Sequence, residues 1–311
     1  MRPKANIIAP GKVMLIGEYA VLEGASAVVM AVDRHVVLYP SKSPATGLVA
    51  FARERAAMAL GLDASAEGFE ADSRAFYDGS AKLGLGSSAA VCVASVASLF
   101  FQAGRDIYED ATRRDIFRLA FEAHNAFQGE RGSGADVAAS CLGGTLVVEM
   151  GNPKGQWNPP VPIRLVFLWS GHVASTPALV QAVRESHKVA RDQYAMLVAR
   201  MAEAADGFVA ASNLTQLLAC IAEYGALMAE LGKHAGVPIV TEEMAQVIAL
   251  ARRSGGAAKP SGAGGGDIMV AAFEPDADVL PFLAQAGKMG MVPLCLAQDR
   301  QGVRITTGRG A

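Results

Sequence analysis

Glycine is concentrated in three short segments, and these segments limit the fold more than any other feature of the chain. The densest spans residues 259–267, KPSGAGGGD, with four glycines in five positions. No helix or strand interior tolerates that density, so it requires backbone at positive φ or a close approach of two segments. Lys259 and Asp267 bracket the glycines, and an apolar stretch over 268–272 follows at once. The pattern indicates a loop anchored at both ends rather than a flexible linker.

A second glycine segment, KLGLGSSAA over residues 82–90, leads into an alanine-rich stretch that predicts a buried helix over 87–101. The first turn of a helix leaves N–H groups unpaired and carries about half a positive charge, so glycines here let phosphate oxygens reach the backbone. Ser87 and Ser88 can cap this helix, or offer hydroxyls to a phosphate or Mg²⁺. The glycine spacing also matches a dinucleotide-binding fingerprint, but no apolar strand precedes it, and no Lys-Ser/Thr pair follows as in a Walker loop.

The remaining glycine segment, APGKVMLIGEYAVLEG over residues 9–24, places Lys12 between a glycine and an apolar run. That position indicates a lysine that points into a site, although a solvated surface lysine also fits the segment taken alone. Lys and Arg total 28 against 30 Asp and Glu, a formal charge of -2. The protein as a whole therefore has no net attraction for nucleic acid or an anionic membrane. An anionic partner must be met by local groups such as Lys12.

An acidic turn, FQGERGSGAD over residues 127–136, holds two carboxylates, Glu130 and Asp136, separated by two glycines. They can converge on one point, one to hold Mg²⁺ and the other to face a reacting group. The alternative is a helix C-cap at Gly129 followed by an N-cap at Ser133, with Asp136 as the capping-box acid. The two interpretations are compatible, and position alone does not separate them.

The amino-acid composition limits the class of protein to which this chain can belong. Of 311 residues, 51% are apolar, enough to bury a substantial core without disulfides. The four cysteines have no CxxC spacing and are predicted to be reduced core residues. No apolar signal region opens the chain, and the long weakly polar stretch Ser87–Phe101 is shorter than the roughly 20 residues of a membrane span. We expect a cytoplasmic protein with neither membrane nor nucleic-acid partner.

Prolines 153, 159, 160 and 162 mark a seam that divides the chain into residues 1–160 and 161–311. Before the seam, four short β-type runs precede two helices and a closing strand; they cover residues 5–9, 13–16, 27–32, 36–39, 87–101, 111–128 and 145–149. After the seam, we expect a strand, four helices and a last set of strands around one helix. These cover residues 164–169, 176–204, 207–222, 224–234, 241–254, 268–272, 277–287, 291–296 and 303–307. Since neither half alternates strand and helix, the fold class is α+β.

With these segments in view, the chain resembles the GHMP kinase family of small-molecule kinases. PGKVMLIGEYAVLEG is similar to the family's first motif, GLGSSAA to its phosphate loop and SGAGGGD to its third motif, in the family's order. The resemblance spans nearly the whole chain. GEY, QGERGSGADVAAS and WSGHVASTPALV most resemble the subgroup that phosphorylates phosphomevalonate, with the subgroup that phosphorylates mevalonate next.

The resemblance implies an α+β fold of two lobes with the active site between them, and ATP and Mg²⁺ as cofactors. It implies that Lys12 and Asp136 are catalytic and that Ser88 and Glu130 bind Mg²⁺. The residues that would bind the nucleotide are Lys82, Gly84, Leu85, Gly86, Ser87, Ser88 and Ala89. Those that would bind the acceptor are Lys12, Glu18, Tyr19, Arg131, Ser133, Gly134, Lys259, Ser261, Gly262, Ala263 and Gly264.

The acceptor decides what Asp136 must do. For an alcohol, a base that removes the hydroxyl proton is worth roughly 10²–10⁴-fold. A phosphate acceptor has a second pKa near 6 and needs counter-charge instead, for which we expect Arg131, Lys82 and Lys259 to assist Lys12. A non-catalytic sensor on the same fold is the alternative from another class, and a homodimer is compatible with the sequence. The five histidines form no ligand spacing, and His124 is predicted to be a core or surface residue.

Overall fold

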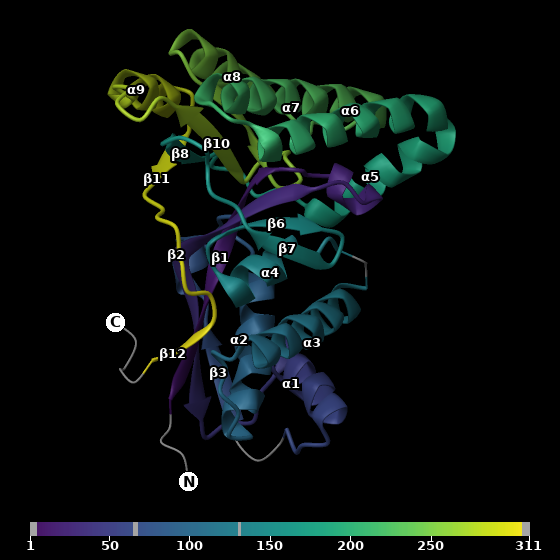
Figure 1. The fold of residues 1–311 in the computed structure, drawn as a ribbon, viewed down its shortest axis with the longest axis vertical. Coiled ribbons are helices and arrows are strands. Elements are labelled where there is room, and N and C mark those ends of the chain that lie inside the picture. The colour runs from purple at the N-terminus through teal and green to yellow at the C-terminus, as the bar shows by residue number, and fades with distance from the viewer. Residues whose placement is uncertain (1–4, 65–67, 130–131, 307–311) are drawn as a thin grey trace.

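The computed structural model describes residues 5–64, 68–129 and 132–306. Two main sheets form two lobes, with helices α1 to α4 beside the first sheet and α5 to α9 around the second (Figure 1), and a third sheet consists of the two short strands β4 (Tyr77–Asp78) and β5 (Ala81–Lys82). The predicted α+β class is confirmed, since strands and helices do not alternate along the chain. Every pairing within the two main sheets is antiparallel.

The first sheet has the order β12-β1-β2-β6-β7, with β3 paired to β2. Its strands are β1 (Asn6–Ile16), β2 (Ala27–Ser41), β3 (Gly68–Asp72), β6 (Thr145–Glu149), β7 (Asn152–Gln156) and β12 (Arg304–Thr306). The four predicted short runs are two long strands. Consecutive residues Pro10 and Gly11 of β1 pair with His35 and Val32 of β2, so Asp33 and Arg34 form a bulge in β2 that interrupts the pairing without ending either strand. A Cβ at Gly11 would lie 2.7 Å from the carbonyl oxygen of Leu85, so only glycine lets β1 approach the second glycine segment (residues 82–90) here.

Helices α1 (Gly47–Leu60), α2 (Ser87–Gln102), α3 (Asp110–Gln128) and α4 (Ala135–Leu142) belong to the first lobe. Helix α2 packs against the other three and against β1 and β2, and it is buried along most of its length. This explains why its sequence is apolar on all sides. The predictions for α2 and α3 are confirmed to within one residue at each end.

The second sheet has the order β11-β8-β10-β9, from β8 (Arg164–Trp169), β9 (Ala257–Ser261), β10 (Ile268–Phe273) and β11 (Val292–Leu294). Its helices are α5 (Thr176–Val189), α6 (Arg191–Ala210), α7 (Leu214–Ala235), α8 (Glu242–Arg253) and α9 (Leu280–Lys288). The first two predicted breaks between these helices, at residues 205–206 and at residue 223, were wrong. The first break is at Ala190, and the second is at Asn213, whose side chain accepts a hydrogen bond from Gln216 N and caps α7.

Glycines inside helices caused those errors. Gly207 lies within α6 and Gly225 within α7, and neither ends its helix. A Cβ at Gly225 would lie 3.0 Å from the carbonyl oxygen of Ala258, and one at Gly207 would lie 3.3 Å from Cys220 Sγ. The glycines therefore permit close packing of α7 on β9 and of α6 on α7.

Helix α7 corrects the expectation about long apolar stretches. Leu214–Ala235, not Ser87–Phe101, is long and apolar enough to cross a membrane by length and composition. One such helix is weak evidence of a membrane span, because core helices pass the same test; α7 packs against α5, α6 and β9.

The cysteines are free as expected, but only Cys92 and Cys141 are buried, and burial raises the pKa of each thiol to about 12.

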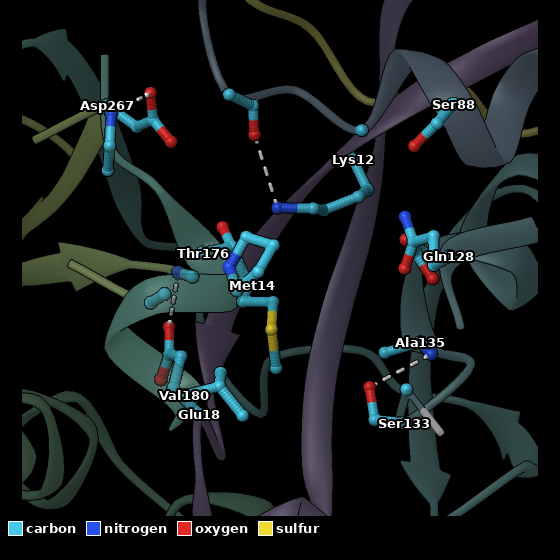
Figure 2. A pocket seen from close by; sticks show the side chains of 18 of the residues that line it. Lys12, Met14, Glu18, Ser88, Gln128, Ser133, Ala135, Thr176, Val180 and Asp267 are labelled. Carbon is cyan, nitrogen blue, oxygen red and sulfur yellow. Dashed lines mark hydrogen bonds between the residues drawn. The ribbon is translucent and has the colours of Figure 1, made fainter. Parts of the chain in front are cut away.

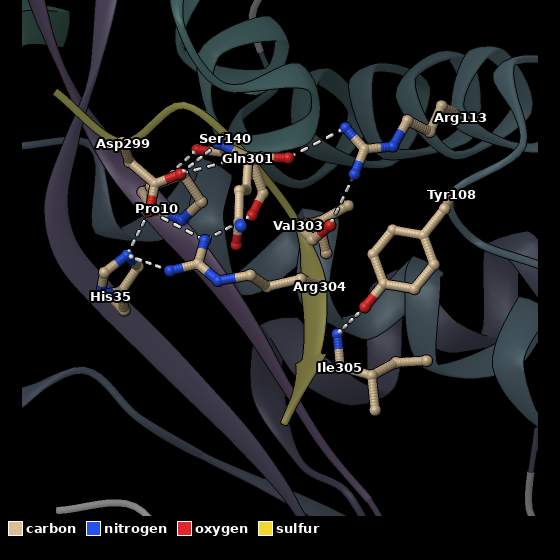
Figure 3. Close-up of polar contacts among 11 residues, drawn as sticks. Pro10, His35, Tyr108, Arg113, Ser140, Asp299, Gln301, Val303, Arg304 and Ile305 are labelled. Carbon is tan, nitrogen blue, oxygen red and sulfur yellow. Dashed lines mark hydrogen bonds and ion pairs between the residues drawn. The ribbon is translucent and has the colours of Figure 1, made fainter. Parts of the chain in front are cut away.

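The chain ends by returning to the first lobe, where β12 pairs with β1 (Figure 1). Residues 161–311 are therefore not confined to the second lobe, and the division at residue 160 stays a prediction. Arg113 of α3 holds the returning segment by donating to the carbonyl oxygens of Gln301 and Val303 at 3.0 and 3.1 Å (Figure 3). Tyr108 Oη accepts from Ile305 N at 3.1 Å.

Asp299 is the centre of this attachment (Figure 3). Its carboxylate lies 2.6 Å from His35 Nε2 and 2.8 Å from Arg304 Nη1, and it accepts from the backbone N–H groups of Gln301 and Gly302 at 2.9 Å. Burial alone would raise the pKa of Asp299, but the hydrogen bonds from His35, Gly302 and Arg304 hold it well below its usual range. The ionised carboxylate therefore stabilises the folded state.

Replacing Asp299 with asparagine should lower the free energy of unfolding by about 2 kcal/mol at pH 7, because charge-assisted hydrogen bonds are lost. A depressed folded-state pKa gives stability that is present above the unfolded pKa and is lost as the pH falls toward the folded pKa. The difference between the parent and Asp299→Asn should therefore shrink as the pH falls below about 4. Urea unfolding at several pH values measures it, and a difference independent of pH would contradict this account.

Candidate active site

A cavity of about 410 Å³ lies between the two lobes. Figure 2 shows Ser88, Gln128 and Ser133 of the first lobe on one side, Asp267, Thr176 and Val180 of the second on the other, and Lys12 between them. All three glycine segments reach this cavity, together with α3, the start of α4 and one face of α5. The lining residues with polar side chains are Lys12, Glu18, Tyr19, Lys82, Ser88, His124, Gln128, Ser133, Asp136, Thr176, Arg184 and Asp267.

The second glycine segment (residues 82–90), which the resemblance identifies as the phosphate loop, enters the cavity at the start of α2. Gly84 and Gly86 have φ values of 76° and 80°, a conformation that favours glycine. A Cβ at Gly84 would lie 2.6 Å from Asp267 Cγ, and one at Gly86 would lie 3.2 Å from Lys12 Cγ. Both glycines are therefore needed for their backbone conformation and for the space they leave. The N-terminus of α2, with its unpaired N–H groups, is at the cavity wall.

Lys12 extends from β1 into the middle of the cavity (Figure 2). Its Nζ donates to the carbonyl oxygen of Gly84 at 3.3 Å, and a Cβ at Gly262 would lie 3.7 Å from it. The ammonium group therefore lies between the phosphate loop and the third glycine segment. Lys12 is thus not a solvated surface lysine, the alternative that the sequence left open.

Asp136 lines the cavity from the first turn of α4. Gly129 is the C-cap of α3, as the capping alternative requires, but the N-cap of α4 is Gly134, with φ of 75°, and no side chain caps the helix, so the capping box of Ser133 and Asp136 is not formed. Ser133 Oγ instead accepts from Ala135 N at 3.3 Å. Asp136 accepts from Val137 N at 2.9 Å, which leaves carboxylate lone pairs available to the cavity.

Two predicted residues of the acidic turn, Glu130 and Arg131, lie outside the described residues. Other predicted residues lie behind the cavity wall. The side chains of Leu85, Ser87 and Ala89 are buried in the first lobe, and Leu85 contributes through its carbonyl oxygen, which accepts from Lys12 N at 2.9 Å.

Lys259 corrects a prediction. We expected it to help hold the acceptor phosphate, but its side chain is 0% exposed and does not line the cavity. Its Nζ donates to Glu18 Oε1 at 2.5 Å and to the carbonyl oxygen of Pro260 at 2.7 Å. Burial lowers the pKa of Lys259, while the adjacent Glu18 carboxylate acts in the opposite direction. Lys259 is therefore half of a buried ion pair.

That ion pair joins the first and third glycine segments. Glu18 Oε1 also accepts from Gly262 N at 3.2 Å, and the hydroxyl of Tyr19 donates to the carbonyl oxygen of Ala263 at 2.5 Å. Ser261 Oγ accepts from Met14 N at 2.9 Å. These contacts fix the loop against β1, so that Gly262 and Ala263 reach the cavity, whereas Lys259 and Ser261 hold them there.

Three cavity residues with titratable side chains were not among the predicted site residues: His124, Arg184 and Asp267. Asp267 is next to the third glycine segment in the sequence, and this position could have identified it as a site residue. Burial raises the pKa of Asp267, and Lys12 and Lys82 act against that rise. Arg184 follows Thr176 and Val180 at four-residue intervals, so it lies on the face of α5 that lines the cavity, which only the tertiary arrangement reveals.

The sequence matches two family models, for the N-terminal domain of GHMP kinases over residues 54–144 and for their C-terminal domain over residues 210–289. The chain belongs to the GHMP kinase family. It is therefore an ATP-dependent kinase, and the second and third glycine segments, one in each matched range, meet at the cavity between the lobes.

Several kinases are similar over their whole length. The phosphomevalonate kinase of Streptomyces sp. strain CL190 is 28% identical, with 95% of this chain and 97% of the relative covered. The mevalonate kinase of Archaeoglobus fulgidus is 27% identical over 91% and 97%. In structure, Streptococcus pneumoniae phosphomevalonate kinase in complex with phosphomevalonate and AMPPNP has a TM-score of 0.79 at 19% identity, covering 94% of this chain and 99% of that one. This structural similarity shows that the two proteins share a fold.

Mg²⁺ fits the donors of the cavity. Ser88 supplies a hydroxyl and Asp136 a carboxylate, both hard oxygen donors beside the N-terminus of α2. Among the described residues no three His, Cys, Asp or Glu side chains gather into a metal cluster. Mg²⁺ is usually held by one or two protein groups together with substrate phosphates and water, and these two oxygen donors would supply such a pair.

Proposed function

We propose that the protein transfers the γ-phosphate of ATP to phosphomevalonate and so forms diphosphomevalonate. The observation that carries the proposal is the gathering of three cationic side chains, Lys12, Lys82 and Arg184, in the one cavity that also holds the phosphate loop. Glu18 at the cavity is neutralised by Lys259, and the other two lining carboxylates are Asp136 and Asp267, so the cations exceed the remaining carboxylates by one in a protein whose net charge is -2. This local excess suits two phosphorylated substrates, and it agrees with the similarity to the Streptomyces phosphomevalonate kinase.

The nucleotide phosphates would be bound by the amides of Gly84 to Ser88 at the start of α2, where the helix dipole favours negative charge. Ser88, with Asp136 near it, would hold Mg²⁺, which supplies charge neutralisation on the transferring group when bound. Lys12 would lie beside the same group, because its Nζ already contacts the phosphate loop at Gly84. Catalysis would then come chiefly from alignment and charge neutralisation.

The role of Asp136 follows from the acceptor. A phosphate monoester is mostly dianionic at neutral pH, so it needs little proton removal before it attacks. For phosphomevalonate, Asp136 would position the acceptor rather than act as its base. For mevalonate, the same carboxylate would have to take the hydroxyl proton.

Arg184 would bind the acid group at the far end of the acceptor. It lines both the main cavity and an adjoining pocket of about 210 Å³, which also contains Leu22, Val180 and Tyr194. Phosphomevalonate is acidic at both ends, and its reacting phosphate must lie beside Lys12. A guanidinium placed along α5 could form a paired hydrogen bond with the remaining carboxylate.

Arg184→Gln should raise the KM for the acceptor about ten-fold or more and leave kcat and the KM for ATP nearly unchanged. A contact far from the reacting atoms stabilises the ground state and the transition state equally, so its loss affects binding and not the chemical step. Steady-state kinetics with each substrate varied in turn measure this. Arg191→Gln, an exposed arginine at the start of α6, is the control. Equal loss for ATP and acceptor would contradict the assignment.

The experiment that tests the function measures ADP release with phosphomevalonate and with mevalonate side by side. We expect turnover with phosphomevalonate and little with mevalonate. The second candidate function is phosphorylation of the mevalonate hydroxyl, which the similarity to the Archaeoglobus mevalonate kinase favours. Turnover of mevalonate alone would establish it and refute the first.

A sensor on the same fold is the third outcome. Ser88 and Asp136 are both present at the cavity, which favours an enzyme. Nucleotide binding without transfer to any isoprenoid, sugar or amino-acid acceptor would establish the sensor.

The proposed reaction needs only small molecules, so we place it in the cytoplasm. Light scattering would decide between a monomer and a homodimer.

A further inference from the structure

His124 contacts the residue that we assign to Mg²⁺. It lies on α3, is 4% exposed and lines the cavity. Its Nε2 is 3.1 Å from Ser88 Oγ and 3.1 Å from Gln128 Nε2. A buried side chain of α3 is therefore bonded to a hydroxyl in the first turn of α2, at the edge of the phosphate site.

The direction of these hydrogen bonds follows from the groups involved. The amide nitrogen of Gln128 can only donate, so His124 Nε2 accepts and carries no proton. In this tautomer the hydroxyl of Ser88 also donates to Nε2, and the two donors share its single lone pair in a three-centre hydrogen bond. With its proton directed toward α3, the Ser88 oxygen keeps its lone pairs for another partner. A hydroxyl oxygen needs a free lone pair to bind a metal ion.

Other serines of the same helix show that this contact is not the default. Ser95 Oγ donates to the carbonyl oxygen of Val91, four residues earlier, and Ser98 Oγ donates to that of Ser95. Ser88 is the second residue of α2, so the carbonyl four residues earlier, that of Gly84, lies outside the helix, and it accepts from Lys12 Nζ. A hydroxyl within a helix commonly bonds back to its own helix, so the cross-helix contact of Ser88 needs a specific acceptor, and His124 supplies it.

We propose that His124 is a positioning residue that orients the Ser88 hydroxyl as a ligand for nucleotide-bound Mg²⁺. Partners behind a metal ligand fix its orientation and typically change metal affinity by about 10–100-fold when removed. The inference rests on the proposed kinase function through the metal–nucleotide complex alone and does not depend on which acceptor is used.

The test measures Mn²⁺ binding by electron paramagnetic resonance, with the protein saturated by AMPPNP. His124→Ala should weaken Mn²⁺ binding about 10–100-fold, with AMPPNP affinity in the absence of metal nearly unchanged. His124→Gln should restore most of the affinity, because its amide oxygen reaches the position of Nε2. His124→Asn should not, because its shorter side chain places an acceptor only near Nδ1. Thermal melts of both variants control for packing.

Three results would overturn the inference. One is Mn²⁺ binding by His124→Ala within about two-fold of the parent. Another is an equal loss in the Gln and Asn variants, which would assign the effect to packing. The third is a Ser88→Ala/His124→Ala double variant that loses the sum of the single effects, since a residue that acts through Ser88 must show no further loss without it. If the Mn²⁺ pattern holds and phosphomevalonate is not phosphorylated, the acceptor assignment fails and the role of His124 stands.

Discussion

Lys12→Met should reduce kcat by about 10²–10³-fold or more while leaving the thermal melt nearly unchanged. The large effect on rate follows because the ammonium lies between the phosphate loop and the third glycine segment, where charge develops in phosphoryl transfer. The small effect on stability follows because the folded protein gives Lys12 Nζ one hydrogen bond in the described residues, of 3.3 Å, to the carbonyl oxygen of Gly84. Single-turnover kinetics and calorimetry on the same preparation measure both.

Two further variants sharpen this prediction. Lys154→Met removes an exposed lysine that pairs with Glu149 on the edge of the first sheet, and neither rate nor stability should change by much. Lys12→Arg keeps the charge but replaces a compact ammonium with a planar group, so it should recover only part of the activity. A large loss of stability in Lys12→Met would instead make Lys12 a structural residue.

The sequence predicted much of the site because glycine is restrictive. At Gly84, Gly86 and Gly262 the backbone has positive φ and lies close to Lys12 or Asp267, so these positions accept few other residues. Such constraints are local and can be recognised without a structure. They place three segments, far apart in the chain, at one cavity.

The residues that sequence reasoning missed, or assigned wrongly, depend on side-chain direction and tertiary neighbours. His124 and Ser88 are 36 positions apart, and a single histidine in a helix has no spacing that indicates a role. Lys259 was assigned to the acceptor because it borders a glycine loop, but it lies in β9, whose residues are all buried. A strand buried on both faces has no alternation that would show which way a lysine points.

Lys259→Met should have the largest effect on stability, a loss of about 3–5 kcal/mol, because it leaves the Glu18 carboxylate buried without its counter-ion. Glu18 Oε2 already has no hydrogen-bond partner among the described residues, so no described neighbour compensates. Urea unfolding measures the loss, with Lys288→Met, an exposed lysine at the end of α9, as the control. A loss below about 1 kcal/mol would mean that the pair is dispensable.

The double variant Glu18→Met/Lys259→Met separates stability from function. Replacing both members of a buried ion pair with apolar side chains is often neutral, so the free energy of unfolding should return close to that of the parent. Activity should not return, because Gly262 N loses its acceptor on Glu18 and the third glycine segment is no longer fixed beside Lys12. Full recovery of both would show that Tyr19 and Ser261 hold the loop by themselves. A stable but slow double variant would assign the ion pair to the placement of the loop rather than to the strength of the fold.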